Sequence, residues 1–175
     1  MDQADLKSRL QQIRALALDV DGVLTDGSFW WGPGGEEWKR FSFADIMGIS
    51  LARRAGLQMG LISGEATPLV DRYAAKMNIA FVAKGCRDKA SALRDFASAT
   101  GVALASICYI GDDVNDVAAM EIAGLSAAPA NAVVIAKSHA TFVTQNSGGN
   151  GAVREIIDAI LAAQELDSRE VFSRQ

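Results

Sequence analysis

The chain has 175 residues, of which 50% are hydrophobic and 22% charged, a balance typical of a globular domain with a substantial core. Its 21 acidic and 17 basic residues give a formal net charge of −4, so the chain lacks the basic field with which proteins bind nucleic acids or anionic membranes. Two cysteines are too few for a disulfide-stapled fold, and no apolar run reaches the roughly 18 residues of a membrane span. We therefore expect a single cytoplasmic domain without nucleic-acid or membrane partners.

Short apolar runs alternate with helical patterns along the chain. The runs, at residues 15–20, 58–62, 80–83, 107–110 and 125–128, are typical of strands buried on both faces of a parallel sheet. Helical patterns follow at 46–55, 68–77, 89–100, 116–123 and 152–164. Thr67-Pro68 suits a helix start, and Gly56 and Gly101 suit helix ends. The alternation predicts a doubly wound, Rossmann-like α/β domain over residues 1–164.

Two segments lie outside this alternation. Residues 28–43 hold two aromatic-rich stretches around Gly32-Pro33-Gly34-Gly35, which predicts a β-hairpin inserted after the first strand. Residues 165–175 lose the apolar periodicity, which predicts a mobile C-terminal tail.

Acidic and polar residues follow three of the predicted strands. Asp19 and Asp21 follow the first strand, Ser63 the second and Asp112 the fourth. The carboxyl ends of parallel strands meet at one edge of the sheet, where α/β domains bind ligands. Asp19 and Asp21 share a face on a straight strand and repel one another, and Asp112 completes an all-oxygen donor set of the kind that Mg²⁺ prefers. The sequence therefore predicts a magnesium site formed by Asp19, Asp21 and Asp112.

A phosphate group at that metal would also require donors. Ser63 with its following backbone N–H, and the ammonium of Lys89, can supply them. We therefore expect phosphoryl transfer, in which Asp19 attacks phosphorus to form an aspartyl-phosphate while Asp21 protonates the leaving oxygen and then activates water. Asp113 and Asp116 would support the metal site from behind, and acidic residues at these positions also suit helix capping.

These motifs resemble those of a known superfamily. Asp-x-Asp-Gly-Val-x-Thr-Asp-Gly at 19–27, Ser-Gly at 63–64, Lys89 and Gly-Asp-Asp-x-x-Asp at 111–116 resemble the four ordered motifs of haloacid dehalogenase superfamily phosphatases. Further segments, at 35–41, 45–49 and 147–155, are similar to the capless branch that dephosphorylates 3-deoxy-2-ulosonic acid phosphates. The resemblance implies a Mg²⁺ cofactor, a small phosphorylated sugar acid as substrate, and substrate contacts from Gly64, Glu65, Lys76, Asp45 and Asn115.

Two positions depart from the eight-carbon members of this branch. Phosphatases of 3-deoxy-manno-octulosonate 8-phosphate usually carry Arg where this chain has Glu65 and Ser50, and neither residue replaces a bidentate guanidinium. Glu65, together with Lys76, instead resembles the group that acts on nine-carbon 2-keto-3-deoxy-nonulosonate 9-phosphate or sialic acid 9-phosphate. We therefore favour the nine-carbon substrate, with the eight-carbon 8-phosphate as the alternative.

The segment between Asp19 and Ser63 already holds the hairpin and a helix, so no cap domain fits there. Its aromatic residues form an apolar patch larger than monomers usually expose: Phe29, Trp30, Trp31, Trp38, Phe41 and Phe43. The related proteins are tetramers whose hairpins associate. The resemblance therefore implies a homotetramer in which neighbouring subunits complete each site.

Other roles remain open for these residues. Similar domains occur fused to sugar-acid cytidylyltransferases, which makes a non-catalytic oligomerisation module an alternative, and a phospho-acceptor like a response regulator shares strand-end aspartates. At single positions, Ser63 and Asn115 also suit helix caps, and Glu65 and Lys76 suit an exposed helix face. His139 suits a structural role, and the glycines of 147–151 suit a flexible loop.

Overall fold

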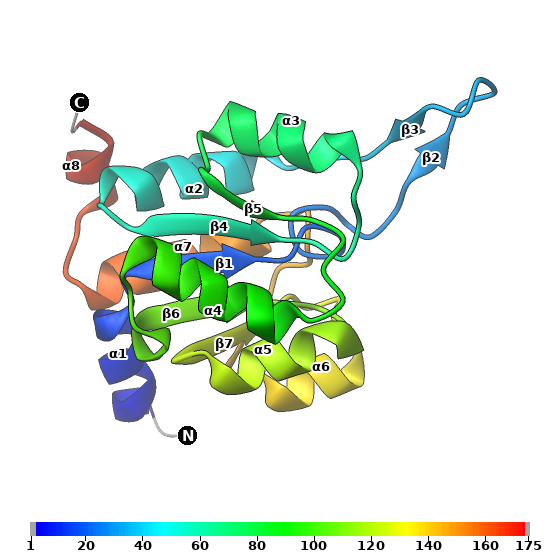
Figure 1. The fold of residues 1–175 in the computed structure, drawn as a ribbon. Coiled ribbons are helices and arrows are strands. Elements are labelled where there is room, and N and C mark those ends of the chain that lie inside the picture. The colour runs from blue at the N-terminus through cyan, green and yellow to red at the C-terminus, as the bar shows by residue number, and fades with distance from the viewer. Residues whose placement is uncertain (1–2, 174–175) are drawn as a thin grey trace.

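The sheet extends from its first strand, β1 (Ala15–Leu18), in both directions. In the computed structural model, which describes residues 3–173, six parallel strands lie in the order β5-β4-β1-β6-β7-β8 (Figure 1). The other five are β4 (Gln58–Ile62), β5 (Phe81–Ala83), β6 (Ile107–Ile110), β7 (Leu125–Ala128) and β8 (Phe142–Val143). In this order the chain adds strands on one side of β1 as far as β5 and then on the other side from β6 onward. The switch point therefore lies between β1 and β6, where doubly wound folds bind ligands.

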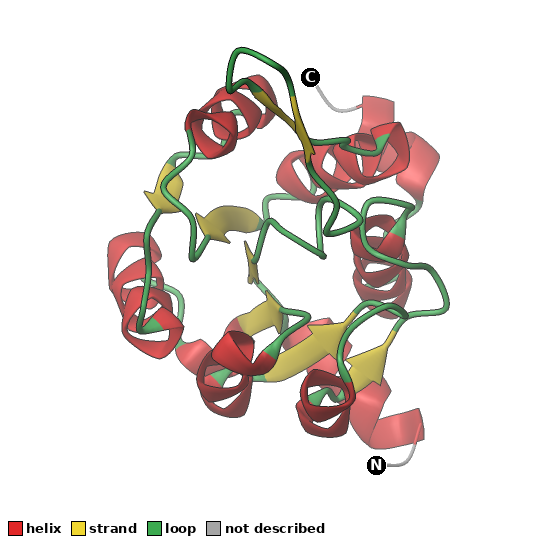
Figure 2. Cartoon of the chain, turned by 90° about the vertical axis from the view of Figure 1, so that its right-hand side faces the viewer, coloured by secondary structure: helices red, strands yellow, loops and turns green. Residues whose placement is uncertain are grey.

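Helices cover both faces of the sheet, as the view along the strands shows (Figure 2). One face carries α1 (Gln3–Gln12), α2 (Phe43–Arg54), α3 (Pro68–Met77), α7 (Ala152–Ala163) and α8 (Ser168–Ser173). The other carries α4 (Lys89–Thr100), α5 (Val117–Ile122) and α6 (Val134–His139), with two short 3₁₀ turns at Leu104–Ser106 and Val114–Asp116. The predicted doubly wound α/β class is therefore confirmed, and no cap domain covers the described part of the chain.

Alternate residues of β1 supply the two halves of the core. Leu16 and Leu18 face the layer of α2 and α7, whereas Ala15 and Ala17 face the layer of α4. All four are fully buried, which explains why this strand is a continuous apolar run rather than an alternating one.

Several predicted boundaries coincide with the structure. The strands at 58–62, 107–110 and 125–128 and the helices at 68–77 and 89–100 have the expected bounds. Thr67 Oγ1 accepts a hydrogen bond from the Leu69 N–H at the start of α3, and Gly101 ends α4 in the left-handed conformation with φ +69°. Local capping chemistry therefore determines these ends.

The hairpin is shorter than the predicted range of 28–43. Its strands are β2 (Trp30–Trp31) and β3 (Glu37–Trp38), which project away from the sheet (Figure 1). Phe43 instead begins α2, because Ser42 Oγ accepts the Ala44 N–H and caps the helix there. Phe41 is not an exposed aromatic as expected, since its ring stacks on Tyr73 with 4.3 Å between centroids.

The segment after residue 164 differs from the mobile tail that we expected. It contains α8, in which Val171 is fully buried, and the Arg54 Nη1 donates to the Phe172 carbonyl at 2.7 Å. The contact with α2 orders a helix too short to show periodicity in the sequence. Residues 1–2 and 174–175, which belong to the predicted domain and tail, lie outside the described residues.

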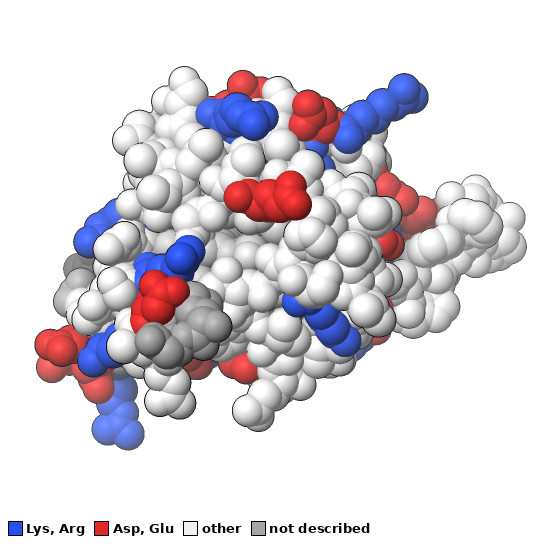
Figure 3. Space-filling view, turned by 90° about the horizontal axis from the view of Figure 1, so that it is seen from below, with Lys and Arg blue, Asp and Glu red and all other residues white. Residues whose placement is uncertain are grey.

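Charged side chains of both signs are interspersed on the face shown in Figure 3, and the outer part of the projecting hairpin shows neither sign in that view. Four hairpin aromatics are about half exposed or more, namely Phe29, Trp30, Trp31 and Trp38, and Trp31 as a whole residue is 72% exposed. Over residues 3–173, no helix combines the length and apolar character that crossing a membrane requires.

Candidate active site

The site lies at the carboxyl ends of β1 and β6, at the switch point of the sheet. Asp19 follows β1 and Asp112 follows β6, and the two chain segments are joined by a hydrogen bond from the Asp19 N–H to the Ile110 carbonyl at 2.9 Å. A pocket of about 260 Å³ opens there. It is lined by Asp19, Asp21, Gly22, Gly27, Gly64, Glu65, Lys89, Asp112, Asp113 and Asn115.

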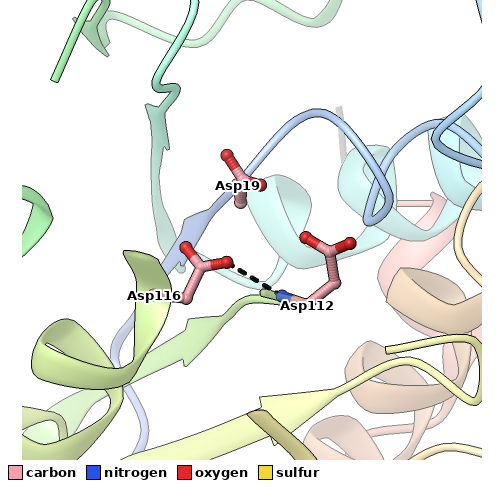
Figure 4. A group of neighbouring side chains, drawn as sticks. All are labelled: Asp19, Asp112 and Asp116. Carbon is pink, nitrogen blue, oxygen red and sulfur yellow. Dashed lines mark hydrogen bonds between the residues drawn. The ribbon is translucent and has the colours of Figure 1, made fainter. Parts of the chain in front are cut away.

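Three carboxylates, those of Asp19, Asp112 and Asp116, lie close together at this site (Figure 4). One oxygen from each of Asp19, Asp112 and Asp116 lies within 4.8 Å of the others. Asp116 is fully buried and both of its oxygens are saturated. Its Oδ1 accepts from Lys89 Nζ and from the Tyr109 hydroxyl, each at 2.7 Å, and its Oδ2 accepts from the backbone N–H groups of Asp112 and Asp113. Asp116 therefore holds its neighbours in place, and of these three carboxylates only those of Asp19 and Asp112 line the pocket.

Lys89 supplies a buried positive charge between two of these carboxylates. Its Nζ lies 2.9 Å from Asp19 Oδ1 and 2.7 Å from Asp116 Oδ1. Burial alone would lower the pKa of Lys89, but the charges of Asp19 and Asp116 outweigh it and raise that pKa above its usual value. Lys89 thus stays an ammonium group at the position where a phosphoryl group would meet Asp19.

The donor set fits a divalent cation. Burial raises the pKa of both Asp19 and Asp112, and the nearby charge of Asp116 adds to each rise, although Lys89 offsets part of it. A cation between the two carboxylates would favour their ionised forms, and an all-oxygen set suits Mg²⁺. Gly22 makes room for this arrangement, because a Cβ there would lie 1.9 Å from Asp112 Oδ2 and its φ is +83°.

Asp21 lies apart from the cluster of carboxylates. We expected its side chain to share a face with that of Asp19, but β1 ends at Leu18 and the chain turns after it. The Asp21 carboxylate instead lies 2.8 Å from Lys39 Nζ, with about one third of its side chain exposed. The structure therefore places it at the mouth of the pocket, outside the group formed by Asp19, Asp112 and Asp116.

The loop after β4 forms another wall of the pocket. Ser63 is only 1% exposed, and its Oγ accepts the Glu65 N–H at 3.1 Å, so the hydroxyl shapes the loop. Gly64, Glu65 and, across from them, Asn115 line the pocket itself. The Glu65 carboxylate binds Lys39 Nζ at 3.0 Å, which gives it a partner within the chain.

Two predicted substrate contacts are not part of this pocket. Asp45 is fully buried, and its carboxylate accepts the N–H groups of Gly151 and Arg154 at 3.1 and 3.0 Å, which caps the start of α7. Asp45 therefore has a structural role: it belongs to α2, and its carboxylate fixes the first turn of α7 against that helix. Lys76 is exposed on α3, and its ammonium lies 5.6 Å from the centroid of the Phe43 ring.

The glycine-rich loop 147–151 packs against the loop that carries the aspartates. The Gly148 N–H donates to Asn131 Oδ1 at 2.7 Å and the Gly149 N–H to the Val23 carbonyl at 3.0 Å. A Cβ at Gly148 would lie 1.8 Å from the Gly22 carbonyl oxygen. This close backbone approach differs from the flexible loop that we expected, and it explains the glycines.

Three residues around the site have roles that the sequence did not predict. Thr25 is fully buried, and its Oγ1 accepts the N–H groups of Gly22 and Gly27, which closes the loop after Asp21. Tyr109 belongs to the apolar run of β6, and nothing in that run indicates that its hydroxyl donates to Asp116. Lys39 lies in the segment 35–41 that resembles the capless branch, but the resemblance gave it no role.

Comparisons with known proteins agree with this geometry. A family model for haloacid dehalogenase-like hydrolases matches residues 61–157. The 3-deoxy-D-manno-octulosonate 8-phosphate phosphatase KdsC of Escherichia coli is 38% identical over 161 residues, which cover 92% of this chain and 86% of that protein.

Solved structures show the same fold. The structure of the corresponding phosphatase from Moraxella catarrhalis, in complex with a magnesium ion, a phosphate ion and KDO, matches with a TM-score of 0.93 and 31% identity, covering 99% of this chain and 100% of that one. The enzyme from Yersinia pestis matches with a TM-score of 0.90 and 36% identity over 92% of this chain and 87% of that one. The chain therefore belongs to the haloacid dehalogenase-like hydrolases, as a phosphoric monoester hydrolase that uses Mg²⁺.

Proposed function

We propose that this chain removes the phosphate of 3-deoxy-D-manno-octulosonate 8-phosphate. The observation that carries the proposal is the convergence of Asp19, Asp112 and the Lys89 ammonium in one pocket, with Asp21 at its mouth. The choice of this sugar acid is supported by the relatives, which are phosphatases of that ester and match this chain over most of their length.

The geometry supports a two-step reaction. Asp19 attacks phosphorus, the bond from phosphorus to the sugar oxygen breaks, and Asp21 gives its proton to that oxygen. Asp21 then takes a proton from the water that attacks the aspartyl-phosphate, which releases inorganic phosphate and restores the Asp19 carboxylate. The Lys89 ammonium offsets negative charge beside Asp19 during both steps. Held by Asp19 and Asp112, Mg²⁺ would supply further charge neutralisation at the phosphoryl oxygens.

A nine-carbon 9-phosphate is the second candidate, and Glu65 is the observation that favours it. Glu65 lines the pocket where the eight-carbon branch usually carries Arg. The hydrogen bond from Lys39 to Glu65 argues against the nine-carbon ester, because a paired carboxylate is less available to a substrate. Lys76 is also engaged with Phe43 rather than with the pocket.

A substrate panel tests the proposal. With Mg²⁺ present, kcat/KM is measured for the eight-carbon 8-phosphate and for the nine-carbon 9-phosphates, on the native chain and on Glu65→Arg. We expect the native chain to prefer the eight-carbon ester. A preference for a nine-carbon ester that Glu65→Arg reverses would replace our proposal by the second candidate, and hydrolysis of none of them would leave the oligomerisation role.

We also propose that the hairpin aromatics assemble the chain into a homotetramer. Trp30, Trp31 and Trp38 expose apolar rings on a projecting arm, where they have little of the chain to pack against. Light scattering at assay concentration should give the mass of four chains, and Trp31→Glu should lower that mass. The mass of a single native chain would contradict the assembly.

A further inference from the structure

Lys39 is a buried lysine surrounded by three carboxylates. Its side chain is only 3% exposed, and its Nζ lies 2.8 Å from Asp21, 3.0 Å from Glu65 and 3.4 Å from Glu37. These partners come from three separate segments: the loop after β1, the loop after β4 and the strand β3 of the hairpin. One ammonium group therefore joins the hairpin to two walls of the pocket.

The environment keeps this lysine charged. Burial alone would lower the pKa of Lys39, but the hydrogen bonds and charges of Asp21 and Glu65 outweigh that effect and raise the pKa above its usual value. Removing a buried charge from such a group leaves its partners unpaired, so a lysine in this position acts strongly on its neighbours.

Among the three partners, Asp21 is the nearest to Lys39 Nζ, and its loop is held by several hydrogen bonds. The loop that carries it is closed by the two hydrogen bonds to Thr25 Oγ1 and by the Gly149 N–H donating to the Val23 carbonyl. Glu65, by contrast, has 57% of its side chain exposed. With the backbone of Asp21 fixed, the contact with Lys39 is what sets the direction of its carboxylate.

We propose that Lys39 is a positioning residue for Asp21, holding its carboxylate at the mouth of the pocket and away from the cluster of Asp19, Asp112 and Asp116. This inference rests on the proposed function, in which Asp21 gives a proton to the oxygen that leaves phosphorus. A carboxylate that is one third exposed loses much of its efficiency if it samples other directions, because proton transfer requires a defined approach to the leaving oxygen.

The test compares two esters that differ in their need for a proton. An alkyl phosphate such as 3-deoxy-D-manno-octulosonate 8-phosphate releases a poor leaving group, whereas para-nitrophenyl phosphate releases one that departs without protonation. The readout is kcat/KM, which includes only the steps up to the release of the alcohol. In Lys39→Met we expect kcat/KM to fall about 100-fold for the alkyl ester and less than about threefold for the aryl ester.

A purely structural role for Lys39 would not separate the two esters. An equal fall for both, or no fall for either, would overturn the proposal. Lys84→Met is the matched control, because Lys84 pairs with Asp71 on the surface and should leave both values unchanged. If Lys39→Met does not fold, Lys39→Gln, which keeps a neutral donor of similar length, should show the same separation.

The activity of the native chain separates a failure of the proposed function from a failure of the Lys39 role. If it hydrolyses the aryl ester but no alkyl ester of a sugar acid, the proposed function fails and the positioning role fails with it. If it hydrolyses both and the variants lose both equally, only the role of Lys39 is overturned.

Discussion

Lys89 and Asp116 form a buried ion pair, with 2.7 Å between Nζ and Oδ1 and no more than 1% of either side chain exposed. Asp116 also binds Tyr109 and two backbone N–H groups, so a single carboxylate fixes both the lysine beside Asp19 and the backbone of Asp112. The positions of Lys89 and Asp112 in the pocket therefore depend on Asp116, a residue that does not line the pocket.

Asp116→Asn should destabilise the protein and weaken catalysis together. The amide keeps the size of the side chain but removes the charge that pairs with Lys89, and breaking a buried pair of this kind costs about 3 to 5 kcal/mol. Chemical denaturation measures this loss. Asp113→Asn is the control, because Asp113 is exposed and Asn also caps helices, so its free energy of unfolding should change by less than about 0.5 kcal/mol.

Asp45→Ala should affect stability and leave substrate binding unchanged. Its carboxylate caps α7 through Gly151 and Arg154, and losing a buried cap costs about 2 kcal/mol. Asp158→Ala breaks only a surface pair with Arg154 and should cost less than about 0.5 kcal/mol. A large rise in KM for Asp45→Ala, in protein that is still folded, would return Asp45 to the substrate-binding residues.

Gly22→Ala should weaken Mg²⁺ binding, because the added Cβ would lie 1.9 Å from Asp112 Oδ2. Gly35 provides a matched control: its φ of +86° is similar, but a Cβ there would meet nothing within 4 Å. Both variants carry a left-handed strain of about 1 kcal/mol, and only Gly22→Ala displaces the ligand. Isothermal titration with Mg²⁺ compares them, and equal affinities in the two variants would argue against Asp112 as a ligand.

Cys108 should contribute to the loss of stability in alkali. Burial raises the pKa of its thiol to about 12, whereas in the unfolded chain the thiol titrates near pH 8.5, so between these values the unfolded state has lost a proton that the folded state keeps. Stability therefore falls as the pH rises. Between about pH 9.5 and about pH 11, the free energy of unfolding of Cys108→Ala should fall with pH less steeply than that of the native chain. The two slopes should differ by about 1.4 kcal/mol per pH unit.

Cys108→Ala also loses packing at every pH, so the slope rather than the absolute value is the readout. Val70→Ala removes atoms from another fully buried position without removing a titratable group, and its slope should match that of the native chain. The same slope in Cys108→Ala and Val70→Ala would contradict the assignment.

The sequence predicts the centre of the fold better than its periphery. The central strands are continuous apolar runs and their helices carry local caps, so neighbouring residues determine their bounds. In contrast, α1 buries only Leu10, and α6 exposes Val134 and Ile135, so neither shows the amphipathic pattern by which a helix is recognised. The helix α8 exists because of its contact with α2, which no local pattern reveals.

Some residues of the candidate site could likewise be located from the sequence, and others could not. The motif order placed Asp19, Asp112 and Lys89 in one pocket, since strand ends at the switch point of a sheet must meet. It could not place Asp45, whose partner Gly151 is 106 residues away, or Lys39, which the hairpin returns to the pocket. It also placed the Asp21 side chain on the same face as Asp19, because a straight strand was assumed where the chain turns.

The most direct measurement is mass spectrometry of the chain after acid quench during turnover of 3-deoxy-D-manno-octulosonate 8-phosphate with Mg²⁺. The peptide that contains Asp19 should carry a phosphoryl group, and Asp19→Asn should carry none and should not turn over. A phosphoryl group on another residue, or undiminished turnover by Asp19→Asn, would contradict the central role of this aspartate.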